Sequence, residues 1–110
     1  MFVVAGVREA GEDMPTEYSI LQNYPNPFNP STHITFAIPK ASRATLAIVD
    51  ALGRVQAVLV DCEKTPGTYS VSWNASRFPS GIYFCQLRAR PTDAARVEEH
   101  EETRRMILLK

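Results

Sequence analysis

The chain has 110 residues, of which 45% are hydrophobic and 22% are charged. This length and composition are typical of one small globular domain with a modest core, and they exclude a disordered tail. The 12 lysine and arginine residues balance the 12 aspartate and glutamate residues, so no net charge draws nucleic acid or an anionic membrane toward the chain. No apolar stretch approaches the roughly 20 residues of a membrane-spanning helix, and the run from Phe2 to Ala5 is too short for a signal peptide.

The first part of the chain is expected to be a linker. Residues 9–17 are acidic and polar with Pro15 among them, which is typical of the end of a connection from an upstream region. The sequence therefore predicts a boundary between a linker at 1–18 and a folded domain at 19–110. It also indicates that the chain is a fragment of a larger protein.

From His33 onward the hydrophobic residues recur with a period of two, which is the pattern of β-strands. Runs at 33–38, 44–50 and 54–61 are predicted strands. Each is expected to place apolar residues on one face, namely Ile34, Phe36 and Ile38, then Leu46 and Ile48, then Val55, Ala57 and Leu59. Between the last two runs, Asp50 can hydrogen-bond the backbone two residues on and Gly53 can take positive φ, so DALGR predicts a β-hairpin.

Three further strands are expected after the turn at Pro66 and Gly67. Their inward faces are predicted to carry Tyr69, Val71 and Trp73, then Tyr83, Cys85, Leu87 and Ala89, and finally Met106 and Leu108. The stretch Thr92–Arg105 contains strong helix formers but almost no apolar face, so it is expected to be a short surface helix or, as we favour, a long solvated hairpin loop. Six or seven short strands separated by Gly/Pro turns predict an antiparallel β-sandwich.

The sequence contains no set of residues with the spacing of a catalytic or metal-binding site. His33 and His100 have no partner set, no serine lies in a nucleophile elbow, and the acids at 98–102 are accompanied by arginines as on a solvated surface. Calcium loops, zinc ligand patterns and phosphate-binding glycine loops are absent from it. We therefore expect no catalytic residue, metal or cofactor. Cys62 and Cys85 either stay free or form one disulfide, which spacing alone does not decide.

Aromatic residues would indicate a sugar-binding surface if they formed an exposed row. Tyr24, Tyr69, Trp73 and Tyr83 fall mostly on predicted inward faces, so core packing is favoured. A carbohydrate-binding module stays open as an alternative because it shares the fold class.

The stretch NYPNPFNPST, residues 23–32, contains three prolines interleaved with asparagines. Proline pushes the residue before it toward extended backbone, and asparagine side chains can replace the backbone donors that proline lacks. The stretch is therefore expected to be stiff without being a strand. Tyr24 and Phe28 are expected to anchor it over one end of the sandwich.

Four motifs together resemble one known family. They are LQNYPNPFNPSTHITFAIP (21–39), LAIVDALGRVQAVLV (46–60), PGTYSVSWNASRFPSGIYF (66–84) and RRMILLK (104–110). In this order and approximate spacing they are similar to the type A C-terminal sorting domain of type IX secretion in Bacteroidetes and related phyla. The resemblance covers about Ser19 to Lys110. The small Ig-like domain of flagellar hook-capping proteins is also similar.

The resemblance implies an immunoglobulin-like sandwich of about seven strands and a non-catalytic targeting function. Such domains follow a secreted cargo in the same chain and are recognised in the periplasm by the outer-membrane translocon. Sortase machinery commonly removes them as the cargo reaches the cell surface or the medium, and cleavage here is expected in the acidic connector before about Leu21. The cargo is expected upstream, with a glycoside hydrolase as one candidate. The motif positions carried over as the sorting signal are Asn23, Pro25, Asn26, Pro27, Phe28, Asn29, Pro30, Asp50, Gly53, Gly67, Trp73, Gly81, Tyr83, Met106, Leu108 and Lys110.

Two features depart from the family. Cys85 stands where an aromatic or aliphatic residue is usual, and a charged insertion at 90–103 replaces a short turn, so the pairing of the last strand is not predicted. Two alternatives to sorting stay open: a carbohydrate-binding accessory module of a secreted glycoside hydrolase, and a structural Ig-like spacer.

Overall fold

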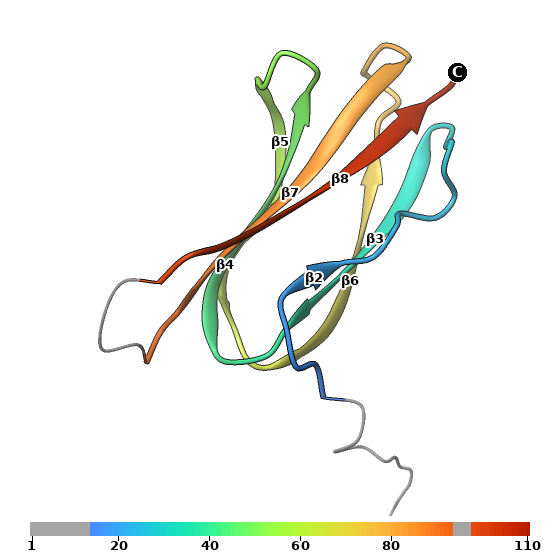
Figure 1. The fold of residues 1–110 in the computed structure, drawn as a ribbon. Coiled ribbons are helices and arrows are strands. Elements are labelled where there is room, and N and C mark those ends of the chain that lie inside the picture. The colour runs from blue at the N-terminus through green and yellow to red at the C-terminus, as the bar shows by residue number, and fades with distance from the viewer. Residues whose placement is uncertain (1–13, 94–97) are drawn as a thin grey trace, which may run out of the picture.

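The computed structural model describes residues 14–93 and 98–110, which form seven strands in two sheets (Figure 1). The first 13 residues of the predicted linker lie outside this description. The strands are β2 (Ser19–Ile20), β3 (Ser31–Ile38), β4 (Ser42–Asp50), β5 (Val55–Lys64), β6 (Gly67–Asn74), β7 (Gly81–Pro91) and β8 (His100–Leu108). One sheet has the order β2-β3-β6 and the other the order β5-β4-β7-β8, with antiparallel pairing throughout. The predicted immunoglobulin-like antiparallel β-sandwich is confirmed.

The core lies between the two sheets and follows the period of two. In β3, for example, Ile34, Phe36 and Ile38 are fully buried while His33 is exposed. Burying one such side chain contributes about 1.5–3 kcal/mol, so a slip of one residue would be costly and the alternation fixes the register. The residues predicted to face inward in β4, β7 and β8 are buried as well, namely Leu46, Ile48, Tyr83, Cys85, Leu87, Ala89, Met106 and Leu108. In β6, Trp73 is buried, and Tyr69 and Val71 are half-buried.

The inward face predicted for β5 is correct only in part. The pairing of β5 with β4 shifts register at two places. Each such β-bulge inserts one extra residue, which exchanges the two faces of the strand. As a result Val55 is 62% exposed, whereas Val60 is buried opposite Leu46. Ala57 and Leu59 are half-buried and pack against the core, as predicted.

The last strand starts earlier than the sequence pattern indicates. β8 begins at His100, so the loop or helix predicted for Thr92–Arg105 is replaced in its second half by strand. β8 pairs with β7 in continuous register from Leu108, opposite Gly81, to His100, opposite Ala89. The hydrogen bonds of this ladder outweigh helix propensity differences, which stay below about 1 kcal/mol per residue. Residues 94–97 of the predicted loop lie outside the described residues.

Tyr18 packs into the domain although it lies on the linker side of the predicted boundary. Its side chain is buried, its hydroxyl lies 2.7 Å from Ser42 Oγ, and its ring stacks on His100 with 4.2 Å between centroids. The boundary between residues 18 and 19 stays a prediction. In 14–93 and 98–110 there is no helix long and apolar enough to cross a membrane.

Candidate recognition site

The residues expected to carry the sorting signal gather mainly at one end of the sandwich. In Figure 1 this end holds the β4–β5 turn, the start of β7, the C-terminus and the loop before β3. We call it the signal end and define it by residues 22–31, 50–54, 75–83 and 106–110. Two predicted residues lie outside this definition. Gly67 begins β6 at the opposite end of the sandwich, and Trp73 lies near the other end of the same strand.

Asp50 organises the β4–β5 turn. Its backbone carbonyl accepts from the N–H of Gly53 at 3.0 Å, and its own N–H donates to the carbonyl of Arg54 at 2.9 Å. One carboxylate oxygen accepts from the N–H groups of Leu52 and Arg54, both at 2.9 Å. The other accepts from Arg54 Nε at 2.8 Å and from Gln56 Nε2 at 3.0 Å. The Arg54 backbone bond is the main cause that holds the pKa of Asp50 below its ordinary value. Gly53 has a φ of 84°, so the predicted hairpin is confirmed.

Side chains supply several of the hydrogen bonds within residues 23–32, which we call the proline segment. Asn23 is buried, and its Nδ2 donates to Thr32 Oγ1 at 2.9 Å and to the carbonyl of Pro25 at 3.2 Å. Thr32 Oγ1 donates to the same carbonyl at 2.9 Å. Asparagine therefore replaces missing backbone donors, as predicted. The peptide bonds preceding Pro25, Pro27 and Pro30 are cis.

The proline segment covers the C-terminal end of the outer edge of β8. The N–H of Phe28 donates to the carbonyl of Ile107 at 2.9 Å, and the carbonyl of Phe28 accepts from the N–H of Leu109 at 3.1 Å. Asn26 Oδ1 accepts from the N–H of Ile107 at 3.0 Å. β7 occupies the other side of β8. These bonds therefore satisfy groups of an edge strand that would otherwise be open for pairing.

An aromatic cluster lies beneath the signal end. Trp73 is its centre, with ring centroids 5.7 Å from Phe28, 5.6 Å from Tyr83 and 5.4 Å from Phe78. Phe28 is buried, so the expectation that it anchors the proline segment is confirmed. The hydroxyl of Tyr83 donates to the carbonyl of Pro79 at 2.7 Å, which ties the turn before β7 to the core. Phe78 is a member that the strand pattern missed, because it lies outside any alternating run.

Tyr24 does not anchor the proline segment or face inward, so both expectations for it are wrong. Its side chain is 77% exposed. The reason is that Asn23 takes the buried position beside it, and neighbouring residues of an extended chain point to opposite sides. Trp73 and Tyr83 are buried as predicted, and Tyr69 is half-buried.

Lys110 is held by contacts that the sequence does not reveal. Its Nζ donates to the carbonyl of Ser76 at 2.6 Å, and its N–H donates to Ser80 Oγ at 2.9 Å. Gln22 similarly donates from Nε2 to the carbonyl of Arg105 at 3.1 Å. The turn-forming residues between β6 and β7 indicate a loop there. They give no indication of which strand end that loop contacts.

Apolar and basic side chains are exposed together at the signal end. The charge of Asp50 is offset there by Arg54 Nε, 2.8 Å away. Each of the four segments contributes an exposed hydrophobic side chain, and three of them also contribute an exposed cation: Tyr24, Leu52, Ile82 and Leu109, with Arg54, Arg77 and Lys110. A surface of this composition is suited to binding another macromolecule.

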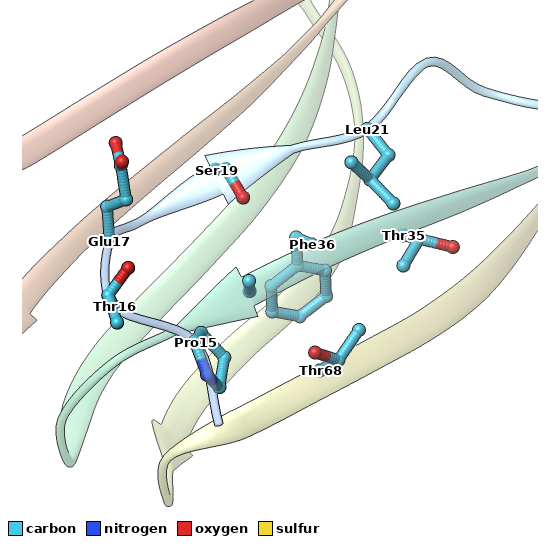
Figure 2. A pocket seen from close by; sticks show the side chains of 9 residues that line it. Pro15, Thr16, Glu17, Ser19, Leu21, Thr35, Phe36 and Thr68 are labelled. Atoms are coloured by element: carbon cyan, nitrogen blue, oxygen red, sulfur yellow. The ribbon is translucent and has the colours of Figure 1, made fainter. Parts of the chain in front are cut away.

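Of two shallow cavities, one is lined by predicted signal residues and the other is not. One of about 330 Å³ lies between the β4–β5 turn and the turn before β7, and its lining includes Asp50, Gly81 and Tyr83. The other, of about 310 Å³, lies beside β2 and contains none of the predicted signal residues (Figure 2). The carboxylate of Glu17 at its rim points away from Thr68. Only the first cavity therefore belongs to the signal end.

The described residues offer no grouping for metal chemistry. No three His, Cys, Asp or Glu side chains in 14–93 and 98–110 come together to hold an ion. Cys62 and Cys85 are both free, which decides the alternative that the sequence left open. Burial raises the pKa of Cys85 to about 12, so its thiol stays protonated at neutral pH. His33 is exposed on β3, and His100 is half-buried against Tyr18.

A small antiparallel β-sandwich whose proline segment is hydrogen-bonded to the end of its last strand places the chain in the class of immunoglobulin-like β-sandwich domains. The family described as "Secretion system C-terminal sorting domain" matches residues 22–96, which include the proline segment and the β4–β5 turn. The chain therefore belongs to this family of type IX secretion sorting domains, as the motifs indicated. The family is non-catalytic and implies secretion to the cell surface or the extracellular space. A search of curated proteins gives no match.

Proposed function

We propose that the chain is the targeting domain of a secreted cargo protein, and that the signal end is the surface recognised by the outer-membrane type IX translocon. The cargo precedes the domain in the same protein, and a glycoside hydrolase is one candidate. In this proposal the domain carries the cargo from the periplasm through the translocon. Sortase machinery then separates the two or attaches the cargo to the cell surface.

The observation that carries the proposal is the junction between the proline segment and β8. The family match covers the proline segment but ends before β8. Hydrogen bonds from Phe28 and Asn26 to Ile107 nevertheless join the two into one surface. This surface exists only when the domain is folded, so a translocon that binds it selects folded domains.

The exposed side chains of the signal end also support the proposal. Tyr24 and Leu52 are each 77% exposed, yet they project from backbone that is held by several hydrogen bonds. Side chains on ordered loops lose little entropy on binding, and tyrosine is a typical energetic centre of protein interfaces. Their positions on loops at one end also fit the usual placement of binding residues.

The carbohydrate-binding alternative finds less support. Among the aromatic side chains that the structure describes, Tyr24 alone is exposed, whereas stacking on a polysaccharide uses a row of rings. We therefore expect that insoluble polysaccharides do not retain the domain, and that soluble polysaccharides do not slow it in affinity electrophoresis.

A secretion assay tests the proposal directly. A reporter cargo with a signal peptide is fused to the chain and expressed in a host with type IX secretion. The double variant Tyr24→Ser/Leu52→Ser removes two exposed side chains and leaves the core intact. We expect at least a tenfold loss of reporter at the surface and in the medium, with accumulation in the periplasm.

Val58→Ser is the matched control, because Val58 is also apolar and 55% exposed but lies on β5 away from the signal end. It should be delivered normally. Deleting residues 19–110 separates two kinds of failure. If the deletion leaves delivery unchanged, the targeting function is wrong. If the deletion blocks delivery but the double variant does not, the function stands and the proposed surface is wrong.

A further inference from the structure

The edge of β6 leaves a regular row of backbone groups open. β6 lies at the end of its sheet, and β3 is its partner. His33 exchanges backbone hydrogen bonds with Tyr24, and the carbonyl of Thr35 accepts from Leu21, so these two residues of β3 direct their backbone away from β6. Alternation then makes Tyr69, Val71 and Trp73 the β6 residues that bond β3. The residues that alternate with them direct their N–H and C=O groups outward, namely Thr68, Ser70, Ser72 and Asn74.

This edge lacks the protection that the other sheet edges in the described chain possess. β5 has two register shifts and carries Asp61, Glu63 and Lys64. β8 is covered at its end by the proline segment, and β2 has two residues. β6 has eight residues in unbroken register with β3, and no residue from Thr65 to Ser76 is charged. Charges, bulges and covering segments are the usual means of preventing edge pairing, so β6 is an open pairing site.

The sequence of β6 is complementary to itself. Read from Thr68 to Asn74 it is TYSVSWN, with Val71 at the centre. In an antiparallel pair centred on Val71, Ser70 lies opposite Ser72 of the other strand. Tyr69 then lies opposite Trp73, and Thr68 opposite Asn74. Each polar residue therefore meets a polar one and each apolar residue an apolar one, on the same face of the joined sheet.

The backbone groups that β6 leaves open fit the same register. In this pairing Ser70 lies opposite Ser72, and Thr68 lies opposite Asn74. All four residues direct their backbone N–H and C=O groups toward the second copy, so each opposite pair can exchange two hydrogen bonds. Two strands related by a two-fold axis contain four such pairs, which provide about eight hydrogen bonds. The inner-face side chains of Tyr69 and Val71 are half-buried at the rim and gain cover from the second copy.

We propose that two copies of the chain associate through β6, antiparallel and centred on Val71, and so join two three-stranded sheets into one of six strands. The second copy is the occupant that fits the edge because the pattern is symmetric about Val71. β6 carries no charge of its own and the whole chain has zero net charge. The cation beside the strand is Lys64, whose Nζ lies 4.7 Å from the ring centroid of Tyr69 and is therefore partly offset by the aromatic face. This association is independent of the targeting function.

Sedimentation equilibrium on the full 110-residue chain tests the pairing. We expect a species of twice the monomer mass at high micromolar concentration. Ser72→Lys adds a charge to the open edge and should weaken association at least tenfold. His33→Lys is the matched control, since His33 is exposed on the same outer face but belongs to a strand that is bonded on both sides. It should leave association unchanged.

Cross-linking tests the register. In a Cys62→Ser background, Val71→Cys brings two thiols together at the two-fold axis, where opposite Cα atoms lie about 4.5 Å apart. Mild oxidation should produce a covalent dimer, and Ser31→Cys in the same background should not. A wild-type chain that stays monomeric near 1 mM would overturn the proposal. A dimer that tolerates Ser72→Lys, or one in which Val71→Cys fails to cross-link, would show that another surface is used and would overturn it equally.

Discussion

The carboxylate of Asp50 accepts four hydrogen bonds, two from backbone N–H groups and two from side chains. The bonds from Arg54 and Leu52 favour the ionised form and outweigh the opposing desolvation, with the Arg54 backbone bond the largest cause, so the pKa of Asp50 lies below its ordinary value. Since the folded-state pKa is lower than that of the unfolded chain, ionised Asp50 stabilises the fold at pH values above about 4. This contribution is lost as the pH falls through the folded-state pKa.

The variant Asp50→Asn should therefore have a lower free energy of unfolding than the wild type at pH 7. The difference should shrink as the pH falls below about 4, because the wild type then loses the same contribution. Urea unfolding at pH 7 and pH 3 measures both values. Asp61→Asn is the control, since Asp61 pairs with Arg43 on an exposed surface and should change stability little. An equal loss at both pH values for Asp50→Asn would contradict the argument.

Among the elements, the regular strands were predictable from sequence and the contacts between segments were not. β3 and β7 alternate strictly, so their faces follow from hydrophobicity alone. The bulges of β5 depend on how it pairs with β4, which no local pattern encodes. β8 was predicted too short because its first residues are charged, and pairing with β7 rather than burial makes them a strand. The same limit applies to the proline segment, whose asparagine hydrogen bonds were predictable although its docking on β8 was not.

Asn26→Ala tests that docking. The substitution removes the acceptor for the N–H of Ile107, a hydrogen bond worth about 1 kcal/mol. The amide of Ile107 should then exchange with solvent deuterium roughly fivefold faster, provided that exchange occurs by local opening. Asn29→Ala, at an exposed position in the same segment, should leave that rate unchanged. Unchanged exchange in Asn26→Ala would mean that the segment does not hold β8.

At the scale of the whole molecule, Phe28 connects parts of the chain that are distant in sequence. It bonds to the end of β8, and its ring packs on Trp73 of the opposite sheet. Loss of this one side chain should therefore weaken the entire fold rather than one loop.

Phe28→Ala should lower the global free energy of unfolding by about 3–5 kcal/mol, the usual cost of removing a buried phenylalanine side chain. Tyr24→Ala, four positions earlier in the same segment and 77% exposed, should change it by no more than about 0.5 kcal/mol. Thermal unfolding followed by circular dichroism compares the two variants. Similar losses in both would mean that the ring of Phe28 is not a core contact.

The hydrogen bond between Asn26 and Ile107 also has a consequence in time, because its partners are separated by 81 positions. A ribosome makes the proline segment long before it makes β8, so the segment has no docking partner until nearly the whole domain has been translated. A chain interrupted before β8 cannot assemble the signal end. The assembled signal end is therefore present only in chains whose translation has included β8, and truncated products lack it.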